Sequence, residues 1–115
     1  MHRVLLLGAG KIGRMIARLL DDSGDYEVLV ADADQAALQR LAKRVSVKTQ
    51  PLDAADAKSL AAAMQDCDSV ISALSYRFNP LVAEVALKTG TSYFDLTEDV
   101  TTTRRVREIA AQAQP

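Results

Sequence analysis

The 115-residue chain contains one cysteine, Cys67, so it can form no intrachain disulfide and gives no sign of an oxidising compartment. No apolar run approaches the ~18–20 residues that a membrane span requires. The apolar start stops at Gly8 and cations follow it, which argues against an export signal and predicts a cytoplasmic protein. With 14 lysines and arginines against 15 acidic residues, the sequence has no electrostatic footprint for nucleic acid or an anionic membrane.

Several catalytic signatures are also missing. No cluster of histidine, cysteine and glutamate has the spacing of a metal site, and neither GxSxG nor GxxxxGK[ST] occurs. Tyr76 and Tyr93 are not followed four residues later by lysine, so the Tyr-x-x-x-Lys pair of short-chain dehydrogenases is missing. We therefore expect no metal site, and we assign no catalytic residue.

Glycine is scarce, but three of the five glycines lie within residues 8–13. They form Gly-Ala-Gly-Lys-Ile-Gly, between the apolar run Val4–Leu7 and an amphipathic stretch. In a dinucleotide-binding fold Gly8 allows a tight turn and Gly10 leaves room for the pyrophosphate. Gly13 lets the following helix pack closely on the sheet. This context predicts a dinucleotide site.

The helix that begins at Lys11 supplies the next part of this site. The backbone N–H groups of Lys11 and Ile12, and the positive end of the helix dipole, are expected to point at the phosphates. A second strand ends at Asp32, whose carboxylate can accept hydrogen bonds from the adenosine ribose. A carboxylate there repels a 2′-phosphate, and residues 33–37 contain no cation to bind one. The predicted cofactor is NAD, with NADP less favoured.

Short apolar strands and amphipathic helices alternate along the chain. This alternation predicts an α/β fold with a doubly wound parallel sheet, that is, a Rossmann fold of five strands in the order 3-2-1-4-5. Ligand is expected where the order reverses between the first and fourth strands. Strands are expected at 3–7, 26–31, 46–50, 68–74 and 91–96. Helices are expected at 11–22, after Asp34, at 57–65, from Pro80 to about 88, and after Asp99 or Thr101 to about 112.

The apolar pattern also predicts which side chains face the sheet. The first helix is expected to bury Ile12, Ile16, Leu19 and Leu20. Polar residues before the later helices predict their N-terminal caps. These caps are Asp34, Asp56, Asn79, which is followed by Pro80 at the first helical position, and Asp99 or Thr101 before the last helix.

Other candidate residues follow the third, fourth and fifth strands. Asp53 follows the third strand, where the adenine edge of a dinucleotide usually lies, and an ordinary turn acid is an equal alternative. Ala73 and Leu74 end the fourth strand, where small residues let the backbone approach the cofactor. His2 lies at the opposite end of the sheet and is expected to have no catalytic role. For Tyr76, Arg77 and Asn79, contact with ligand and contact with a further domain remain alternatives. Asp95 ends the fifth strand on the same edge, and a functional role is the less favoured interpretation there.

Four segments together resemble the N-terminal cofactor domain of the saccharopine dehydrogenase family, especially its lysine 6-dehydrogenase branch. They are Gly-Ala-Gly-Lys-Ile-Gly, Val-Ala-Asp-Ala-Asp, the stretch 68–79 and the segment 91–97. Ser75 departs from the family, which often has proline there. The resemblance implies an oxidoreductase that passes hydride between the C–N bond of an amino acid and nicotinamide. It also implies that a domain beyond Pro115 binds the substrate and supplies the catalytic groups.

On this interpretation residues 1–115 are the dinucleotide-binding domain of a longer protein, cut before a sixth strand. The edge of the strand expected at 91–96 would then be exposed and could pair with a second copy. A regulatory alternative stays open, because nucleotide-sensing modules of potassium-uptake systems share the glycine loop and the acid-ended second strand. Such modules bind nucleotides as signals and do no chemistry.

Overall fold

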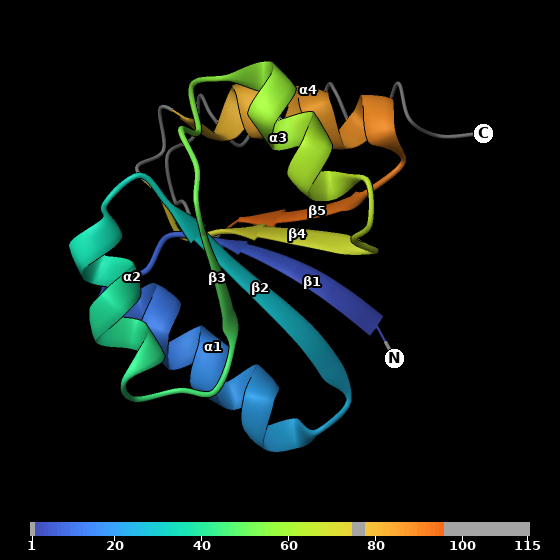
Figure 1. Cartoon of the computed structure of the whole chain (residues 1–115). Coiled ribbons are helices and arrows are strands. Elements are labelled where there is room, and N and C mark those ends of the chain that lie inside the picture. Colours follow the sequence, from blue (N-terminus) through green and yellow to red (C-terminus); the bar gives the residue numbers. More distant parts are fainter. Residues whose placement is uncertain (1, 75–77, 96–115) are drawn as a thin grey trace.

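The computed structural model describes residues 2–74 and 78–95 (Figure 1). Within these ranges, five parallel strands form one sheet in the order β3-β2-β1-β4-β5, which confirms the predicted topology. The strands are β1 (His2–Leu7), β2 (Tyr26–Asp32), β3 (Lys48–Pro51), β4 (Ser69–Ser72) and β5 (Ser92–Asp95). The helices are α1 (Lys11–Ser23), α2 (Gln35–Ala42), α3 (Ala57–Met64) and α4 (Asn79–Thr89).

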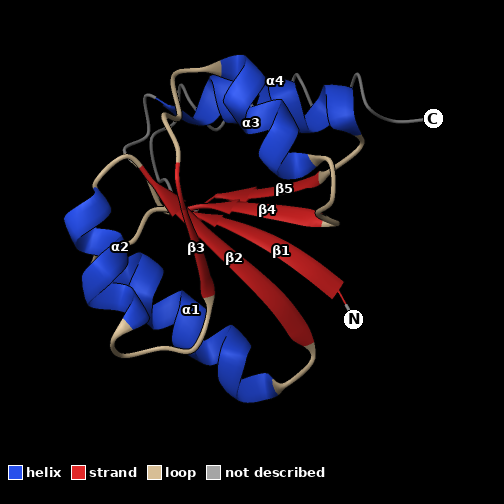
Figure 2. Cartoon of the chain, in the orientation of Figure 1, coloured by secondary structure: helices blue, strands red, loops and turns tan. Residues whose placement is uncertain are grey.

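The sheet is covered on both faces, as a doubly wound fold requires. Helices α1 and α2 lie on one face and α3 and α4 on the other (Figure 2). Each face has its own hydrophobic core, because alternate residues of a strand point to opposite sides. Leu6 of β1 packs in the core under α1 and α2, whereas Leu5 and Leu7 pack in the core under α3 and α4.

The strand order reverses at β1, which pairs with β2 on one side and β4 on the other. Leu7, the last residue of β1, is in register with Ala31 and with Ser72. Asp32 is in register with Pro51, and Ser72 with Asp95. The carboxyl ends of all five strands therefore lie along one edge, where open α/β sheets bind their ligands.

Of the three predicted helix caps that lie among the described residues, two are confirmed. The Asp34 carboxylate accepts hydrogen bonds from the N–H groups of Ala36 and Ala37, and Asp56 caps α3 in the same way. The third cap is wrong, because α4 begins at Asn79 itself, without a side-chain cap. The side chain of Asn79 is buried and accepts a hydrogen bond from the Ser72 hydroxyl instead.

The predicted buried face of α1 is also partly wrong. Gly13 and Ala17 are the residues of α1 that are fully buried. Ile12 is 54% exposed and Leu19 64%. Ile16 and Leu20 are half-buried and pack against the core under α1 and α2, as predicted. At Gly13 the helix lies too close to the glycine turn for any side chain.

Strand boundaries differ modestly from expectation. β3 begins two residues later than predicted and includes Pro51, which is tolerated because β3 is an edge strand that pairs only with β2 in the described sheet. β4 and β5 are shorter than predicted. Tyr76, Arg77 and the helix expected near 99–112 lie outside the described residues. Within the described part of the chain, no helix has the length and apolarity needed to cross a membrane.

Candidate dinucleotide-binding site

The turn between β1 and α1 depends on glycine at its first position. Gly8 has φ +108°, which side-chain-bearing residues rarely adopt. A Cβ atom on Gly8 would also lie 3.0 Å from the carbonyl oxygen of Ala73. The N–H of Gly8 donates to the carbonyl of Ala31 at 2.8 Å, and that of Ala73 donates to Leu7 at 2.8 Å. The turn is thus fixed to the ends of both neighbouring strands.

Gly13 is required for a different reason. A Cβ atom at this position would overlap the carbonyl oxygen of Gly8. The first turn of α1 therefore packs directly on the glycine turn, as the sequence pattern predicted.

Gly10 lies in open space. Its φ of −73° is accessible to any residue, and apart from its chain neighbours no atom of the described residues lies within 4 Å of a Cβ placed on it. Gly10 is the N-cap of α1 and provides no side-chain cap. Its carbonyl accepts the first helical hydrogen bond, from the N–H of Arg14. The preceding N–H groups, including those of Lys11 and Ile12, have no partner within the helix and can meet an anion in this space.

Asp32 connects the glycine loop to the second strand. One carboxylate oxygen accepts a hydrogen bond from the N–H of Ala9 at 2.8 Å, and the other from the N–H of Asp34 at 2.9 Å. Each carboxylate oxygen can accept a second hydrogen bond. The side chain is therefore held in place by the backbone and can still receive ribose hydroxyls.

A cavity of about 140 Å³ lies next to Asp32 at the carboxyl edge of the sheet. It brings Asp32 together with Asp53 and Leu74, two of the other predicted site residues. The Asp53 carboxylate also accepts the N–H of Ala55 at 2.9 Å, so it stabilises its own turn as well. The remaining walls are apolar and come from Leu7, Ala31, Ala33, Leu52, Ala54 and Phe78.

Some of these wall residues were not predicted. Leu52 and Phe78 are far apart in the sequence, and the fold brings both to the cavity at the carboxyl end of β1. The apolar residues that follow the third strand, Leu52 and Ala54, were the available signal. Ala73, by contrast, does not line the cavity, and its carbonyl group lies against Gly8 of the glycine turn.

Two other sequence candidates fall elsewhere. His2 starts β1 at the amino end of the sheet, where its Nε2 lies 2.8 Å from the Ser69 hydroxyl, far along the strand from the glycine turn. Asp95 ends β5 at the carboxyl edge, on the same face of the strand as Tyr93. Burial and the nearby Asp95 carboxylate raise the pKa of the Tyr93 hydroxyl, which keeps it protonated.

The fold and these contacts define a dinucleotide-binding domain of the Rossmann type. The chain belongs to the saccharopine dehydrogenase family, because residues 4–115 match the family model described as the saccharopine dehydrogenase NADP binding domain. This match confirms the family predicted from the sequence, whereas the lysine 6-dehydrogenase branch stays a prediction.

Relatives among known proteins agree. The chain is 38% identical over 88 residues to saccharopine dehydrogenase [NADP(+), L-glutamate-forming] of Saccharomyces cerevisiae, covering 76% of this chain and 20% of the yeast protein. The solved apo structure of the same yeast enzyme matches with a TM-score of 0.88 at 31% identity, covering 98% of this chain and 25% of that one. A putative myo-inositol dehydrogenase from Sinorhizobium meliloti, with 24% identity and a TM-score of 0.79, shares the fold.

These relatives support an oxidoreductase and a nicotinamide dinucleotide, but only at the level of the class. The chain spans a quarter or less of the yeast protein, which is named as a dehydrogenase. The family model and the yeast enzyme both carry NADP in their names. A nicotinamide dinucleotide is therefore supported as the ligand, whereas the predicted preference for NAD is not.

Proposed function

We propose that residues 1–115 form the cofactor domain of an oxidoreductase that transfers hydride between the C–N bond of an amino acid and nicotinamide, and that the domain prefers NAD to NADP. The nicotinamide ring, when bound, supplies the hydride acceptor or donor. The substrate domain belongs to another part of the parent protein. Membership of the saccharopine dehydrogenase family supports this function over the regulatory alternative.

The observation that carries the proposal is the open space at Gly10. Neither the backbone angles nor any neighbouring atom requires glycine there. A side chain at this position would nevertheless occupy the space in front of the N–H groups of α1. A ligand phosphate explains both the missing side chain and the uncapped helix.

The other site residues would bind successive parts of the same dinucleotide, from the pyrophosphate to the adenine ring. Gly10 would leave room for the pyrophosphate, and the backbone N–H groups of Lys11 and Ile12 would donate hydrogen bonds to it. Asp32 would accept the adenosine ribose hydroxyls. The apolar cavity beside Asp32 and Asp53 would take the adenine ring.

The preference for NAD rests on charge. The Asp32 carboxylate would lie next to the 2′ position of the ribose, where a phosphate carries additional negative charge. Residues 33–37 offer no lysine or arginine to offset that repulsion. The free energy of NADPH binding should therefore be less favourable than that of NADH.

Catalysis requires more than this domain provides. Hydride transfer needs the reacting carbon held ~3–3.5 Å from the nicotinamide and a general base near the substrate amine. We assign neither function to a residue of this chain. We expect the 115-residue chain to bind cofactor without reducing it in the presence of lysine or saccharopine.

Fluorescence titration of the purified chain with NADH and NADPH tests the proposal in two parts. Tighter binding of NADH supports both parts, equal affinity removes the NAD preference, and binding of neither removes the dinucleotide function. Absorbance of NADH in the presence of lysine or saccharopine tests whether the chain binds the cofactor without catalysing hydride transfer. Turnover by the chain alone would show that the chemistry resides in residues 1–115.

A further inference from the structure

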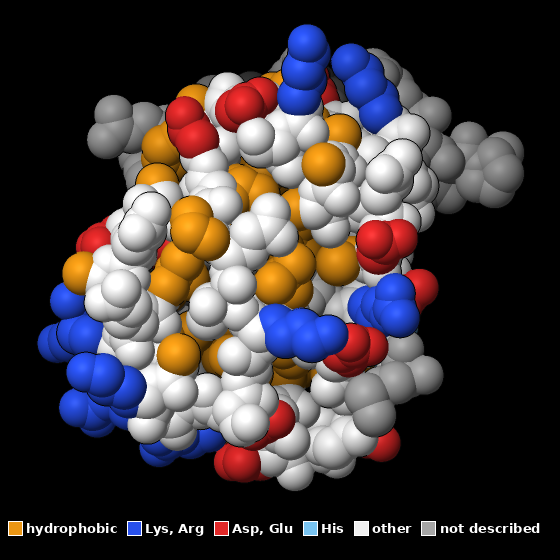
Figure 3. Space-filling model, in the orientation of Figure 1, with side chains coloured by type: hydrophobic (Ala, Val, Ile, Leu, Met, Phe, Trp, Pro, Cys, Tyr) orange, Lys and Arg blue, Asp and Glu red, His pale blue; other side chains and the backbone are white. Residues whose placement is uncertain are grey.

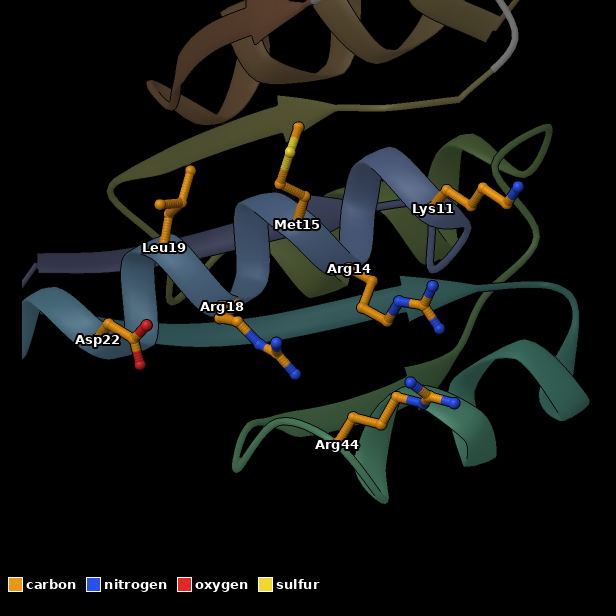
Figure 4. Close-up of a pocket in the computed structure, with 7 residues that line it drawn as sticks. All are labelled: Lys11, Arg14, Met15, Arg18, Leu19, Asp22 and Arg44. Carbon is orange, nitrogen blue, oxygen red and sulfur yellow. The ribbon is translucent and has the colours of Figure 1, made fainter.

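The outer side of α1 carries a second feature that dinucleotide binding does not use. A hollow of about 340 Å³ opens between α1 and the segment that follows α2 (Figure 4). Four of its seven lining residues are cations and one is an acid. The lining residues are Lys11, Arg14, Met15, Arg18, Leu19, Asp22 and Arg44.

The three arginines come from two separate elements and lie on the same side of α1, whereas the Lys11 side chain extends away from them (Figure 4). Arg14 and Arg18 extend from α1 towards α2, and the guanidinium group of Arg44 extends from the far side towards that of Arg14 (Figure 4). Lysine and arginine side chains gather over this edge of the molecule (Figure 3). The chain as a whole carries a net charge of −1, so this concentration of positive charge is local.

The positive charges of the hollow exceed its single acid, Asp22, which follows Arg18 by four residues on α1. Among the described residues, the ion pairs within 4.0 Å involve His2, Arg3 and Lys48, and none includes a cation of the hollow. Arg14 and Arg18 are four residues apart on a helix, where like charges repel. Lys11 and Arg14 also lie in the first turns of α1, at the positive end of its dipole. A bound anion would relieve each of these repulsions.

We propose that this hollow is a binding site for an oligophosphate group, separate from the place of the dinucleotide pyrophosphate. Guanidinium groups bind phosphate oxygens through paired hydrogen bonds, and several of them around one hollow suit adjoining phosphates better than a single carboxylate. The Gly10 site is built from backbone N–H groups, whereas this site is built from side chains on the outer surface of α1. Lys11 links the two, since its N–H lies in the glycine loop and its side chain lines the hollow.

Titration calorimetry of the 115-residue chain with inorganic tripolyphosphate tests the proposal. We expect saturable binding that weakens with added salt. Arg14→Gln and Arg44→Gln should each weaken it roughly tenfold, the loss expected for hydrogen bonds to a charged group. Arg40→Gln is the matched control, because Arg40 is an exposed cation of α2 outside the hollow.

A second variant separates this proposal from the dinucleotide function. The Gly10→Val variant should no longer bind NADH but should bind tripolyphosphate with the affinity of the parent. If Gly10→Val abolishes tripolyphosphate binding, the anion occupies the glycine loop and the separate site is wrong. Equal affinities of the parent, Arg14→Gln and Arg44→Gln would overturn it too, as would an Arg40→Gln variant that loses as much affinity as they do. ATP and tripolyphosphate titrated side by side distinguish a nucleotide source from an inorganic one.

Discussion

Gly13 lies so close to Gly8 that a Cβ atom on Gly13 would overlap the carbonyl oxygen of Gly8. This contact sets how near α1 approaches the sheet. It also explains why no larger residue fits at position 13, where the helix is fully buried. The orientation of the helix N-terminus towards the ligand edge depends on it.

Gly13→Ala should therefore lower the free energy of unfolding by about 1–3 kcal/mol, because α1 must move away from the turn. Urea denaturation measures this change. Gly10→Ala is the control, since its added methyl group meets open space and its backbone angles are ordinary. Equal midpoints for parent and Gly13→Ala would show that the turn can shift without cost.

Gly10→Val separates folding from binding. The valine side chain projects into solvent in the free domain, so unfolding should stay cooperative with a midpoint near that of the parent. The same side chain would occupy the space of the pyrophosphate, so NADH fluorescence titration should show no saturable binding. A variant that binds NADH like the parent would mean that the glycine loop is only a structural turn.

Asp32→Ala should weaken NADH binding roughly tenfold or more, because hydrogen bonds to a charged group are worth ~1.5–3 kcal/mol. Asp32 also receives the N–H groups of Ala9 and Asp34, so part of that loss reflects a loosened loop. Asp32→Asn keeps the shape and removes the charge, and it should shift the ratio of NADPH to NADH affinity towards NADPH. Asp25→Asn, in the exposed turn before β2, controls for net charge. An unchanged ratio in Asp32→Asn would contradict the charge argument.

Ser72→Ala tests the buried contact that links β4 to α4. The Ser72 hydroxyl donates to the side-chain oxygen of Asn79 at 2.7 Å, and both residues are about 1% exposed. Removing the donor leaves a buried acceptor unsatisfied, which should cost about 1–3 kcal/mol in urea unfolding. Ser92→Ala, on an exposed position of β5, should change stability little. Similar losses in both variants would show that the Ser72–Asn79 hydrogen bond adds nothing specific.

Cys67 should react slowly with thiol reagents. Burial first, and then the negative charges of Asp66 and Asp68, raise the pKa of its thiol. At pH 8 less thiolate is present than in an ordinary cysteine, and the thiolate is the nucleophile. Iodoacetamide labelling followed by mass spectrometry should be slow in the folded chain and faster in urea. Equal rates in the two conditions would contradict this.

Local chemistry determined much of this molecule. The glycine spacing, Asp32 and the alternation of apolar strands with helices predicted the strand order and the Gly8–Gly13 turn. Asp34 and Asp56 were identified as caps because a cap acts on N–H groups two or three residues away. Interactions of such short range are readable in a linear sequence.

Tertiary structure decided the contacts between distant elements. Asn79 reads as a cap in the sequence, yet it bonds to Ser72 because β4 ends beside the start of α4. The apolar pattern of α1 identified Ile16 and Leu20, which pack against the core, but not Gly13 and Ala17, the residues that are fully buried. Leu52 and Phe78 share a cavity, and Arg14 and Arg44 share a hollow, only after the strands have been ordered. Such pairs depend on packing in three dimensions, which leaves no periodic trace along the chain.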